Sequence, residues 1–179
     1  MKNNRLPRDK IKTMSAMIEI LRSFEQKKKK YILTNGCFDI LHLGHIRYLQ
    51  RAKEFANTLI VALNSDTSVK TIKGNDRPLL PEMERAEILA SLECVDYVFI
   101  FDDPKLDSVL SALRPIMYAK GGDYVLDPKD AKPGKPAIVQ SEREIIDSYG
   151  GKIVIIPSEK DVSTTNIIQS ILSTYNSRN

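Results

Sequence analysis

The sequence predicts an α/β protein with a Rossmann-like, doubly wound sheet of five parallel strands in a single domain. Two observations support this fold class: apolar segments of strand length alternate with helical segments, and each strand segment is apolar throughout, as in a sheet covered on both faces. The 179 residues, 42% of them hydrophobic, suit one domain with a substantial core. We expect residues 1–30 to form an N-terminal helical extension and residues 31–176 to form the main domain.

The first half of the chain supplies three helices and two strands. Apolar residues three and four apart predict the first helix, whereas the strands are apolar runs that end at polar residues or glycine. Asn64, Ser65 and Asp66 offer N-caps for the third helix. In order, the elements are helix Met14–Gln26, strand Tyr31–Thr34, helix Ile46–Ala56, strand Leu59–Leu63 and a short helix that ends near Ile72.

The second half supplies four helices and three strands. Pro81 suits the first turn of a helix, Gly150 and Gly151 suit a helix end, and Ser163 or Thr164 would cap the last helix. Residues 127–136, rich in proline, lysine and aspartate, are expected to form a loop. In order, the elements are helix Pro81–Leu92, strand Tyr97–Phe101, helix Leu106–Leu113, strand Ile116–Ala119, helix Ser141–Tyr149, strand Ile153–Ile156 and helix Ser163–Thr174.

The formal net charge of +4 and the sequence pI near 9.0 are compatible with a polyanionic partner. Much of the excess lies in Lys27–Lys30, which we interpret as a solvated helix C-terminus, because cations favour that end of the helix dipole and no aromatic residues interleave with the lysines. We therefore expect no nucleic-acid partner. A small anionic substrate accounts equally well for the charge.

Cysteine content and hydropathy indicate a reducing, cytoplasmic compartment. Cys37 and Cys94 form neither a disulfide framework nor a metal-ligand spacing. The longest apolar runs are far shorter than the ~20 residues of a membrane-spanning helix, so no membrane association is expected. No apolar stretch follows the N-terminal charges, so we expect no signal peptide.

The segment from Thr34 to His45 carries the strongest chemical signal. It follows a strand, begins a helix and holds both histidines of the chain, His42 and His45. Glycines at 36 and 44 permit close approach of the backbone, and a helix N-terminus binds anions. Since no G-x-G-x-x-G or P-loop pattern is present, this segment is the candidate phosphate site, with the imidazoles as donors.

Three other interpretations of this segment are open on the residues alone. The histidines are structural in the first. In the second they bind zinc, which needs a third ligand that no cluster supplies at usable spacing. In the third Cys37 is a nucleophile, although nothing visible orients a histidine toward it.

The string from Thr34 to His45 resembles the H-x-G-H nucleotidyltransferases. Among these it is most similar to the heptose 1-phosphate adenylyltransferases, which make ADP-heptose for bacterial lipopolysaccharide. The resemblance runs from about Tyr31 to Ile171, and the further matching pieces are Asn64-Ser-Asp66, Lys73-Gly74, Arg77-Pro78, Arg85, Val95-Asp96, Lys120-Gly-Gly-Asp-Tyr124, Gly150-Gly151 and Ser163-Thr-Thr-Asn-Ile-Ile168.

The resemblance implies three groups of site residues. The catalytic group comprises His42, His45, Lys73 and Arg85. The nucleotide-binding group comprises Asn35, Gly36, Cys37, Phe38, His42, Gly44, His45, Lys120, Gly121, Gly122, Asp123, Tyr124, Ser163, Thr164 and Thr165. The acceptor-binding group comprises Asp39, Asn64, Asp66, Lys70, Lys73, Arg77 and Arg85.

Several of these residues also have ordinary structural interpretations. Ser163–Thr165 would be a simple N-cap, and Lys120–Tyr124 would be an ordinary turn as readily as a ribose and base site. The basic residues between the second and third strands, Lys70, Lys73, Arg77 and Arg85, would be an exposed basic face.

The reaction implied is transfer of AMP from ATP to D-glycero-β-D-manno-heptose 1-phosphate, with release of pyrophosphate. Mg²⁺ would accompany ATP without a dedicated set of protein ligands. A separate heptose kinase would supply the acceptor, since the fused kinase half of many relatives is absent from this sequence, and a homodimer is expected. Residues 125–138 are longer than the pattern, and would form a lid or touch the sugar. The alternatives are a cytidylyltransferase acting on glycerol 3-phosphate or a similar phospho-alcohol, and a nucleotide- or nucleic-acid-binding module without catalysis.

Overall fold

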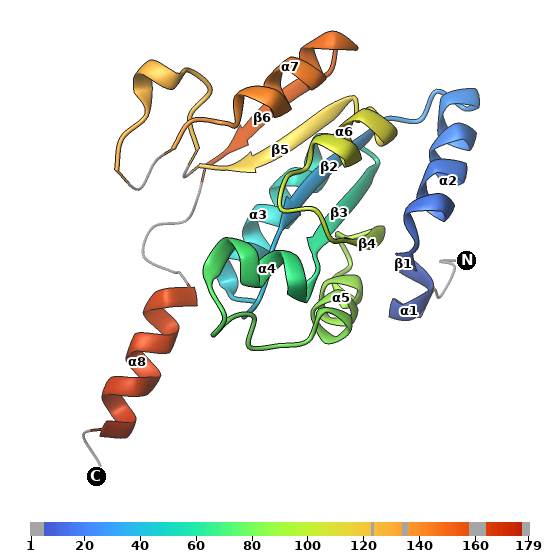
Figure 1. The fold of residues 1–179 in the computed structure, drawn as a ribbon. Coiled ribbons are helices and arrows are strands. Elements are labelled where there is room, and N and C mark those ends of the chain that lie inside the picture. Colours follow the sequence, from blue (N-terminus) through green and yellow to red (C-terminus); the bar gives the residue numbers. More distant parts are fainter. Residues whose placement is uncertain (1–5, 123, 134–135, 158–163, 177–179) are drawn as a thin grey trace.

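One parallel sheet of six strands forms the centre of the molecule, with helices on both faces (Figure 1). The computed structural model describes residues 6–122, 124–133, 136–157 and 164–176. The strand order is β1-β4-β3-β2-β5-β6, and every neighbouring pair is parallel. Apart from the edge strand β1, this is the order of a doubly wound Rossmann-like sheet, as the sequence predicted.

The strands and helices alternate as expected from the hydropathy pattern. The strands are β1 Ile11–Lys12, β2 Tyr31–Gly36, β3 Thr58–Asn64, β4 Tyr97–Phe101, β5 Met117–Gly121 and β6 Lys152–Ile156. The helices are α1 Pro7–Lys10, α2 Met14–Gln26, α3 Leu43–Glu54, α4 Asp66–Lys73, α5 Glu82–Ser91, α6 Asp107–Leu113, α7 Gln140–Ser148 and α8 Thr164–Asn176, with a 3-10 turn at Pro128–Asp130.

The predicted count of five strands is wrong by one, because β1 was not expected. Its two residues pair with β4, Ile11 opposite Val98 and Lys12 opposite Phe99. Two residues carry no recognisable alternation of apolar and polar side chains, so only the neighbouring strand defines this edge. Lys10 reinforces the position by donating to the carbonyl oxygen of Leu92 at 3.0 Å.

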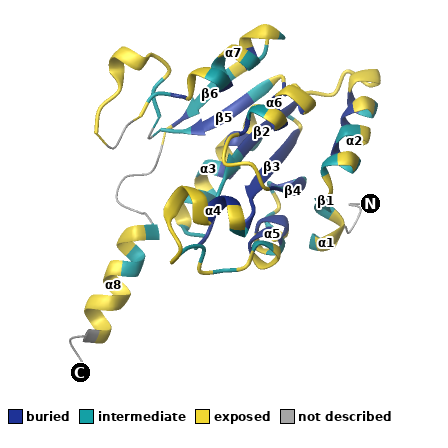
Figure 2. Ribbon diagram, in the orientation of Figure 1, coloured by how far each residue is buried: buried dark blue, intermediate teal, exposed yellow. Residues whose placement is uncertain are grey.

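Two buried clusters cover the two faces of the sheet, and the buried residues follow its strands in Figure 2. Helices α2, α6 and α7 contribute to one cluster, which includes Met17 and Leu21 of α2. Helices α3 and α5 contribute to the other, which includes Leu49 and Leu89. The N-terminal helix α2 therefore packs on the chain's own sheet, burying apolar side chains whose exposure to water would cost ~25 cal/mol per Å².

The topology places a binding edge between β2 and β5. The chain runs outward from β2 in both directions, so the crossover helices leave a crevice at the carboxyl ends of these two strands. β2 ends at Gly36, directly before the segment with both histidines, and β5 ends at Gly121. Among the described helices, none combines the length and apolar character needed to cross a membrane.

Candidate active site

The histidine segment leaves the carboxyl end of β2 and begins α3. His42 is the N-cap residue of α3, with extended backbone, and His45 lies in the first turn of that helix. Backbone N–H groups without intrahelical partners point outward at such a helix start, and the helix dipole adds positive potential. Both histidines therefore lie where this helix end favours a phosphate group.

The two imidazole rings stack on each other, with centroids 3.8 Å apart and an angle of 25° between the ring planes. The Nδ1 atom of each ring is buried, and neither has a hydrogen-bond partner within the described part of the chain. A buried polar atom is costly unless a ligand or water supplies the partner. This pair therefore marks a position for a ligand with hydrogen-bonding oxygens.

Both histidines are neutral at physiological pH. Burial, with smaller contributions from the nearby His42 and Lys73, lowers the pKa of His45 from 6.5 to about 4, although a hydrogen bond with the Ile40 backbone acts in the opposite direction. Burial also lowers the pKa of His42. A neutral imidazole keeps one N–H, and a ring that directs this N–H at the ligand donates to a phosphate oxygen without carrying a charge.

Phe38 supports His45 from the protein interior. Its buried ring meets the His45 ring edge to face, with centroids 5.2 Å apart. The Phe38 backbone has a positive φ of 42°, which turns the chain sharply after β2. A Cβ atom on Gly36 would lie 2.9 Å from Cε2 of Phe38, so this approach requires glycine. Sequence reasoning placed both residues at the nucleotide; the structure shows how they support the histidine.

Lys73 brings positive charge close to the same loop. It is the last residue of α4 and is exposed, and its charge lowers the pKa of both His45 and Cys37. Lys70, three residues earlier in the same helix, is exposed as well. An exposed ammonium group near the histidines is suited to a second phosphate group.

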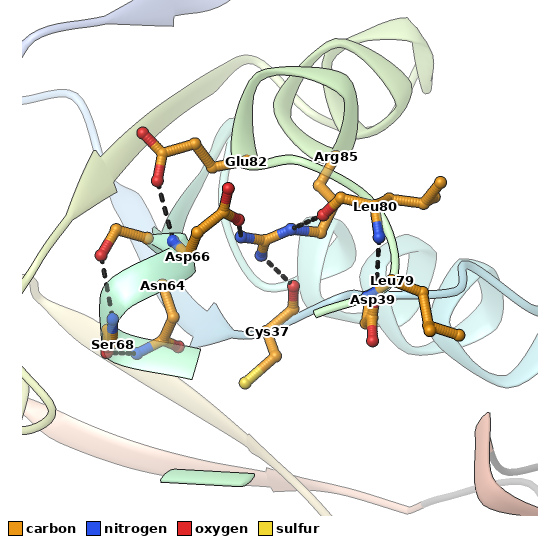
Figure 3. A network of polar contacts seen from close by, with 10 residues as sticks. Cys37, Asp39, Asn64, Asp66, Ser68, Leu79, Leu80, Glu82 and Arg85 are labelled. Carbon is orange, nitrogen blue, oxygen red and sulfur yellow. Dashed lines mark hydrogen bonds and ion pairs between the residues drawn. The ribbon is translucent and has the colours of Figure 1, made fainter. Parts of the chain in front are cut away.

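Arg85 lies in the interior and connects three segments, as Figure 3 shows. Its side chain has an exposed fraction of 0%. Nε donates to the carbonyl oxygen of Leu80 at 2.9 Å, and Nη1 donates to that of Cys37. Nη2 donates to Oδ1 of Asp66 at 2.7 Å. All three nitrogens of the guanidinium group thus have protein acceptors, and the contacts join the loop after β2, the start of α4 and the loop before α5.

Asp39 also holds the loop before α5, through hydrogen bonds with its backbone. Its carboxylate is almost fully buried, and Oδ1 accepts hydrogen bonds from the backbone N–H of Leu79 at 2.7 Å and of Leu80 at 3.1 Å (Figure 3). Oδ2 lies 2.8 Å from Nη1 of Arg77. Asn64 is also buried, and its side-chain amide donates to Ser68 Oγ at 2.9 Å. These predicted acceptor residues are in contact with protein groups.

The nucleotide end of the predicted site lies at the end of β5. Lys120 is buried and contacts Asn35 and Glu142, and Gly121 ends the strand beside it. Tyr124 is half-buried, with Lys120 Nζ 4.9 Å from its ring centroid. Sequence reasoning missed Glu142, because a glutamate on an amphipathic helix resembles a solvent-exposed residue. The only available signal was that a lysine at the end of a buried strand needs a counter-charge.

The start of α8 approaches the histidine loop, which comprises residues 37–42 between β2 and α3. Thr164 Oγ1 lies 3.5 Å from the carbonyl oxygen of Ile40, whereas Thr165 is exposed. This contact brings the second predicted phosphate-binding helix start to the first. Two other predicted site residues, Asp123 and Ser163, lie outside the described residues.

The alternative of a nucleophilic Cys37 finds little support in this geometry. Burial raises the pKa of the Cys37 thiol, so the thiolate needed for nucleophilic attack is disfavoured. The described residues contain no group of three or more histidine, cysteine, aspartate or glutamate side chains placed to hold a metal ion.

The loop after Tyr124 is closed at its base. Val125 and Ala137 form a β-bridge, and the backbone N–H of Val125 donates to the Pro136 carbonyl at 3.0 Å. The backbone N–H of Ile138 returns a hydrogen bond to Val125, also at 3.0 Å. The long segment therefore leaves and rejoins the domain at one point, beside Tyr124.

Known proteins match most of the chain. Residues 33–170 match the cytidylyltransferase-like family. The "Bifunctional protein HldE" of Geobacter sulfurreducens is 42% identical over 166 residues, which cover 93% of this chain and 32% of that protein. The protein of the same name from Geotalea uraniireducens is 43% identical over 162 residues, 90% of this chain and 31% of that one. The chain thus spans about a third of the length of these relatives.

Solved structures share the fold at lower identity. A lipopolysaccharide core biosynthesis protein of Thermoplasma volcanium is 24% identical, with a TM-score of 0.55, over 75% of this chain and 99% of that one. Pantoate-beta-alanine ligase of Francisella tularensis is 18% identical, with a TM-score of 0.61, over 87% of this chain and 71% of that one. The solved structures show a shared fold, and the match over residues 33–170 shows that the chain belongs to the cytidylyltransferase-like family.

Proposed function

We propose that this chain transfers AMP from ATP to D-glycero-β-D-manno-heptose 1-phosphate, giving ADP-heptose and pyrophosphate for lipopolysaccharide core biosynthesis. The observation that carries the proposal is the stacked pair of neutral histidines at the start of α3, whose buried Nδ1 atoms find no partner among the described residues. The choice of acceptor rests on the resemblance of the Lys120–Tyr124 and Ser163–Ile168 segments to heptose 1-phosphate adenylyltransferases.

The reaction joins a phosphate oxygen of the acceptor to the α-phosphorus of ATP. The bond from that phosphorus to the oxygen that bridges the α- and β-phosphates breaks, and pyrophosphate leaves with the bond electrons. Because the acceptor oxygen is already anionic, no general base is needed. Catalysis then consists of positioning and of stabilising negative charge during in-line transfer.

The residues near the α3 start divide this work. His42 and His45 donate hydrogen bonds to triphosphate oxygens. The backbone at Gly44, between the two histidines, and Thr164 at the start of α8 provide further donors to the same group. Lys73, assisted by Lys70, neutralises the acceptor phosphate and the charge that develops during transfer. The exposed position of Lys73 beside His45 supports this role.

Arg85 and Asp39 receive a positioning role in this proposal. The sequence suggested that both contact the acceptor. Since their charged groups face protein partners at 2.7–3.1 Å, we assign them the task of holding the histidine loop, α4 and the loop before α5 in register. The same positioning role applies to Asp66, Asn64 and Arg77, which also contact protein groups.

Mg²⁺ would accompany ATP and offset the charge of the triphosphate. It prefers oxygen ligands and retains much of its hydration, so phosphate oxygens and water suit it as the main ligands. We further propose a cytoplasmic homodimer whose acceptor is supplied by a heptose kinase.

Pyrophosphate release tests the function directly. ATP, CTP and GTP are offered separately with heptose 1-phosphate and Mg²⁺, and release with ATP alone is the expected result. Release only with CTP would retain the chemistry and move the assignment to a cytidylyltransferase, with glycerol 3-phosphate as the next acceptor. Absence of release with every nucleotide and both acceptors would contradict the proposal.

A further inference from the structure

A buried polar cluster lies beside the proposed base site and has no part in the proposed phosphate chemistry. It comprises Asn35 at the end of β2, Tyr118 and Lys120 of β5, and Glu142 of α7. Glu142, Lys120 and Tyr118 are all buried, with exposed fractions of 4%, 7% and 0%. Two charged side chains inside a small domain are unusual, since removing each from water is costly.

The contacts in this cluster converge on Lys120 and Asn35. Lys120 Nζ lies 3.3 Å from Glu142 Oε2 and 3.2 Å from Asn35 Oδ1. The Tyr118 hydroxyl lies 2.8 Å from Asn35 Oδ1 and 3.2 Å from Glu142 Oε2, so its proton serves either acceptor. Because Oδ1 of Asn35 faces Tyr118 and Lys120, the two N–H groups of this planar amide point the other way.

The same ammonium group lies near two aromatic rings. Lys120 Nζ is 5.0 Å from the ring centroid of Tyr118 and 4.9 Å from that of Tyr124. These distances are within the range of cation–π attraction, which depends on the lysine remaining charged. The carboxylate of Glu142 provides the counter-charge that allows a charged lysine at this depth. A chain of contacts therefore runs from Glu142 through Lys120 to Tyr124.

We propose that Glu142 is a positioning residue for recognition of the nucleotide base. It holds Lys120 against the Tyr124 ring, and it thereby fixes the ring on which the base stacks and the Asn35 amide at the neighbouring strand end. This inference rests on the proposed function, in which Tyr124 stacks on adenine. A base on Tyr124 would use the ring face opposite the ammonium group.

The absence of tryptophan from the sequence allows a direct binding measurement. Tyr124→Trp introduces a single indole that retains stacking and cation–π capacity. We expect ATP to quench its fluorescence and inorganic tripolyphosphate, which lacks a base, to leave it unchanged. Displacement of a labelled nucleotide gives the affinity for tripolyphosphate in the same protein.

Glu142→Gln in this background should weaken ATP binding about tenfold and leave tripolyphosphate binding within twofold. In the otherwise unsubstituted chain, the same change should raise KM for ATP about tenfold, with kcat and KM for the acceptor within twofold. Glu144→Gln is the matched control, because Glu144 is exposed on the same helix and pairs with Gln140 at 2.8 Å. It should change neither constant, and Glu142→Asp should restore part of the ATP affinity.

A double variant separates positioning from simple burial of charge. Lys120→Met with Glu142→Gln removes both charges, so the cost of an unpaired buried ammonium disappears. If the cluster only stabilised the fold, the double variant would lose affinity for ATP and for tripolyphosphate equally or not at all; we expect a loss for ATP and tripolyphosphate binding within twofold. The double variant also carries the test if Glu142→Gln alone does not fold.

The possible results distinguish the two proposals. Unchanged ATP affinity in Glu142→Gln, or equal loss for ATP and tripolyphosphate, overturns the role of Glu142 while pyrophosphate release by the unsubstituted chain still supports the function. Failure of the unsubstituted chain to bind ATP overturns both.

Discussion

The histidine pair and the Arg85 cluster are both connected to the loop between β2 and α3, yet their buried polar atoms differ in whether they have protein partners. Around Arg85, each guanidinium nitrogen meets an acceptor within the protein. Around His42 and His45, the buried Nδ1 atoms meet none in the described chain. Polar groups that are satisfied internally stabilise a fold, whereas buried groups left unsatisfied point to a ligand. The contrast therefore separates support from chemistry within one sequence motif.

The largest expected effect tests the chemical side of this contrast. His45→Ala should lower turnover about 10³-fold, because the variant loses a preorganised donor to a phosphate that gains charge in the transition state. The free energy of unfolding should fall by only about 1–2 kcal/mol, because the variant loses the ring contacts with Phe38 and His42 and the hydrogen bond with the Ile40 backbone. Pyrophosphate release and calorimetry measure the two effects. His45→Gln, which retains an N–H donor, should keep more activity than His45→Ala; near-normal turnover of His45→Ala would remove the assigned role.

The next effect tests the supporting side. Arg85→Met keeps the length of the side chain but leaves the Asp66 carboxylate and two carbonyl oxygens without their donor. We expect a loss of about 3 kcal/mol in the free energy of unfolding, typical of a broken buried ion pair. Arg8→Met is the control: Arg8 pairs with Glu87 at 3.2 Å on the surface, and its loss should cost less than about 1 kcal/mol.

Denaturant titration of both arginine variants gives these values. If Arg85→Met instead unfolded like the unsubstituted chain and raised only KM for the acceptor, Arg85 would belong with the substrate contacts.

A smaller effect concerns pH. The pKa of His45 is about 4 in the folded protein and 6.5 in an unfolded chain, so between these values the unfolded state binds more protons. Stability should therefore be fully present above pH 6.5 and fall as the pH drops toward 4, by at most about 2 kcal/mol between pH 7 and pH 5. His45→Gln should show a shallower dependence in denaturant titrations at pH 7, 6 and 5. Equal slopes in the two proteins would mean that His45 is not buried as a neutral group.

The regular elements were predictable because each carries its own pattern. The apolar runs of β2 to β6 and the helical spacing of α2 place these elements within a few residues of their observed bounds. β1 was not predictable, since two residues form a strand only because β4 lies beside them. The candidate phosphate-binding segment was recognisable from its order along the chain: strand, glycine, histidines, helix.

The roles of individual charged residues were less predictable. Arg85 resembles an exposed basic residue in sequence, and only the packing of α5 shows that its side chain is interior. Glu142 is separated from Lys120 by 22 positions, and no local pattern relates them. Pairing of buried charges depends on which elements become neighbours in the fold, and a single sequence does not contain that information directly.

The strand order has a consequence for how specificity can change. β2 lies between β3 and β5, so the proposed acceptor side is built from residues 64–85 and the proposed nucleotide side from residues 118–165. Apart from residues 35–45, which lie between the two sides, each side is one uninterrupted stretch of sequence. Exchange of one stretch between related proteins should therefore transfer the preference for one substrate while the other is retained. The strand order therefore allows acceptor specificity and nucleotide specificity to change independently of each other.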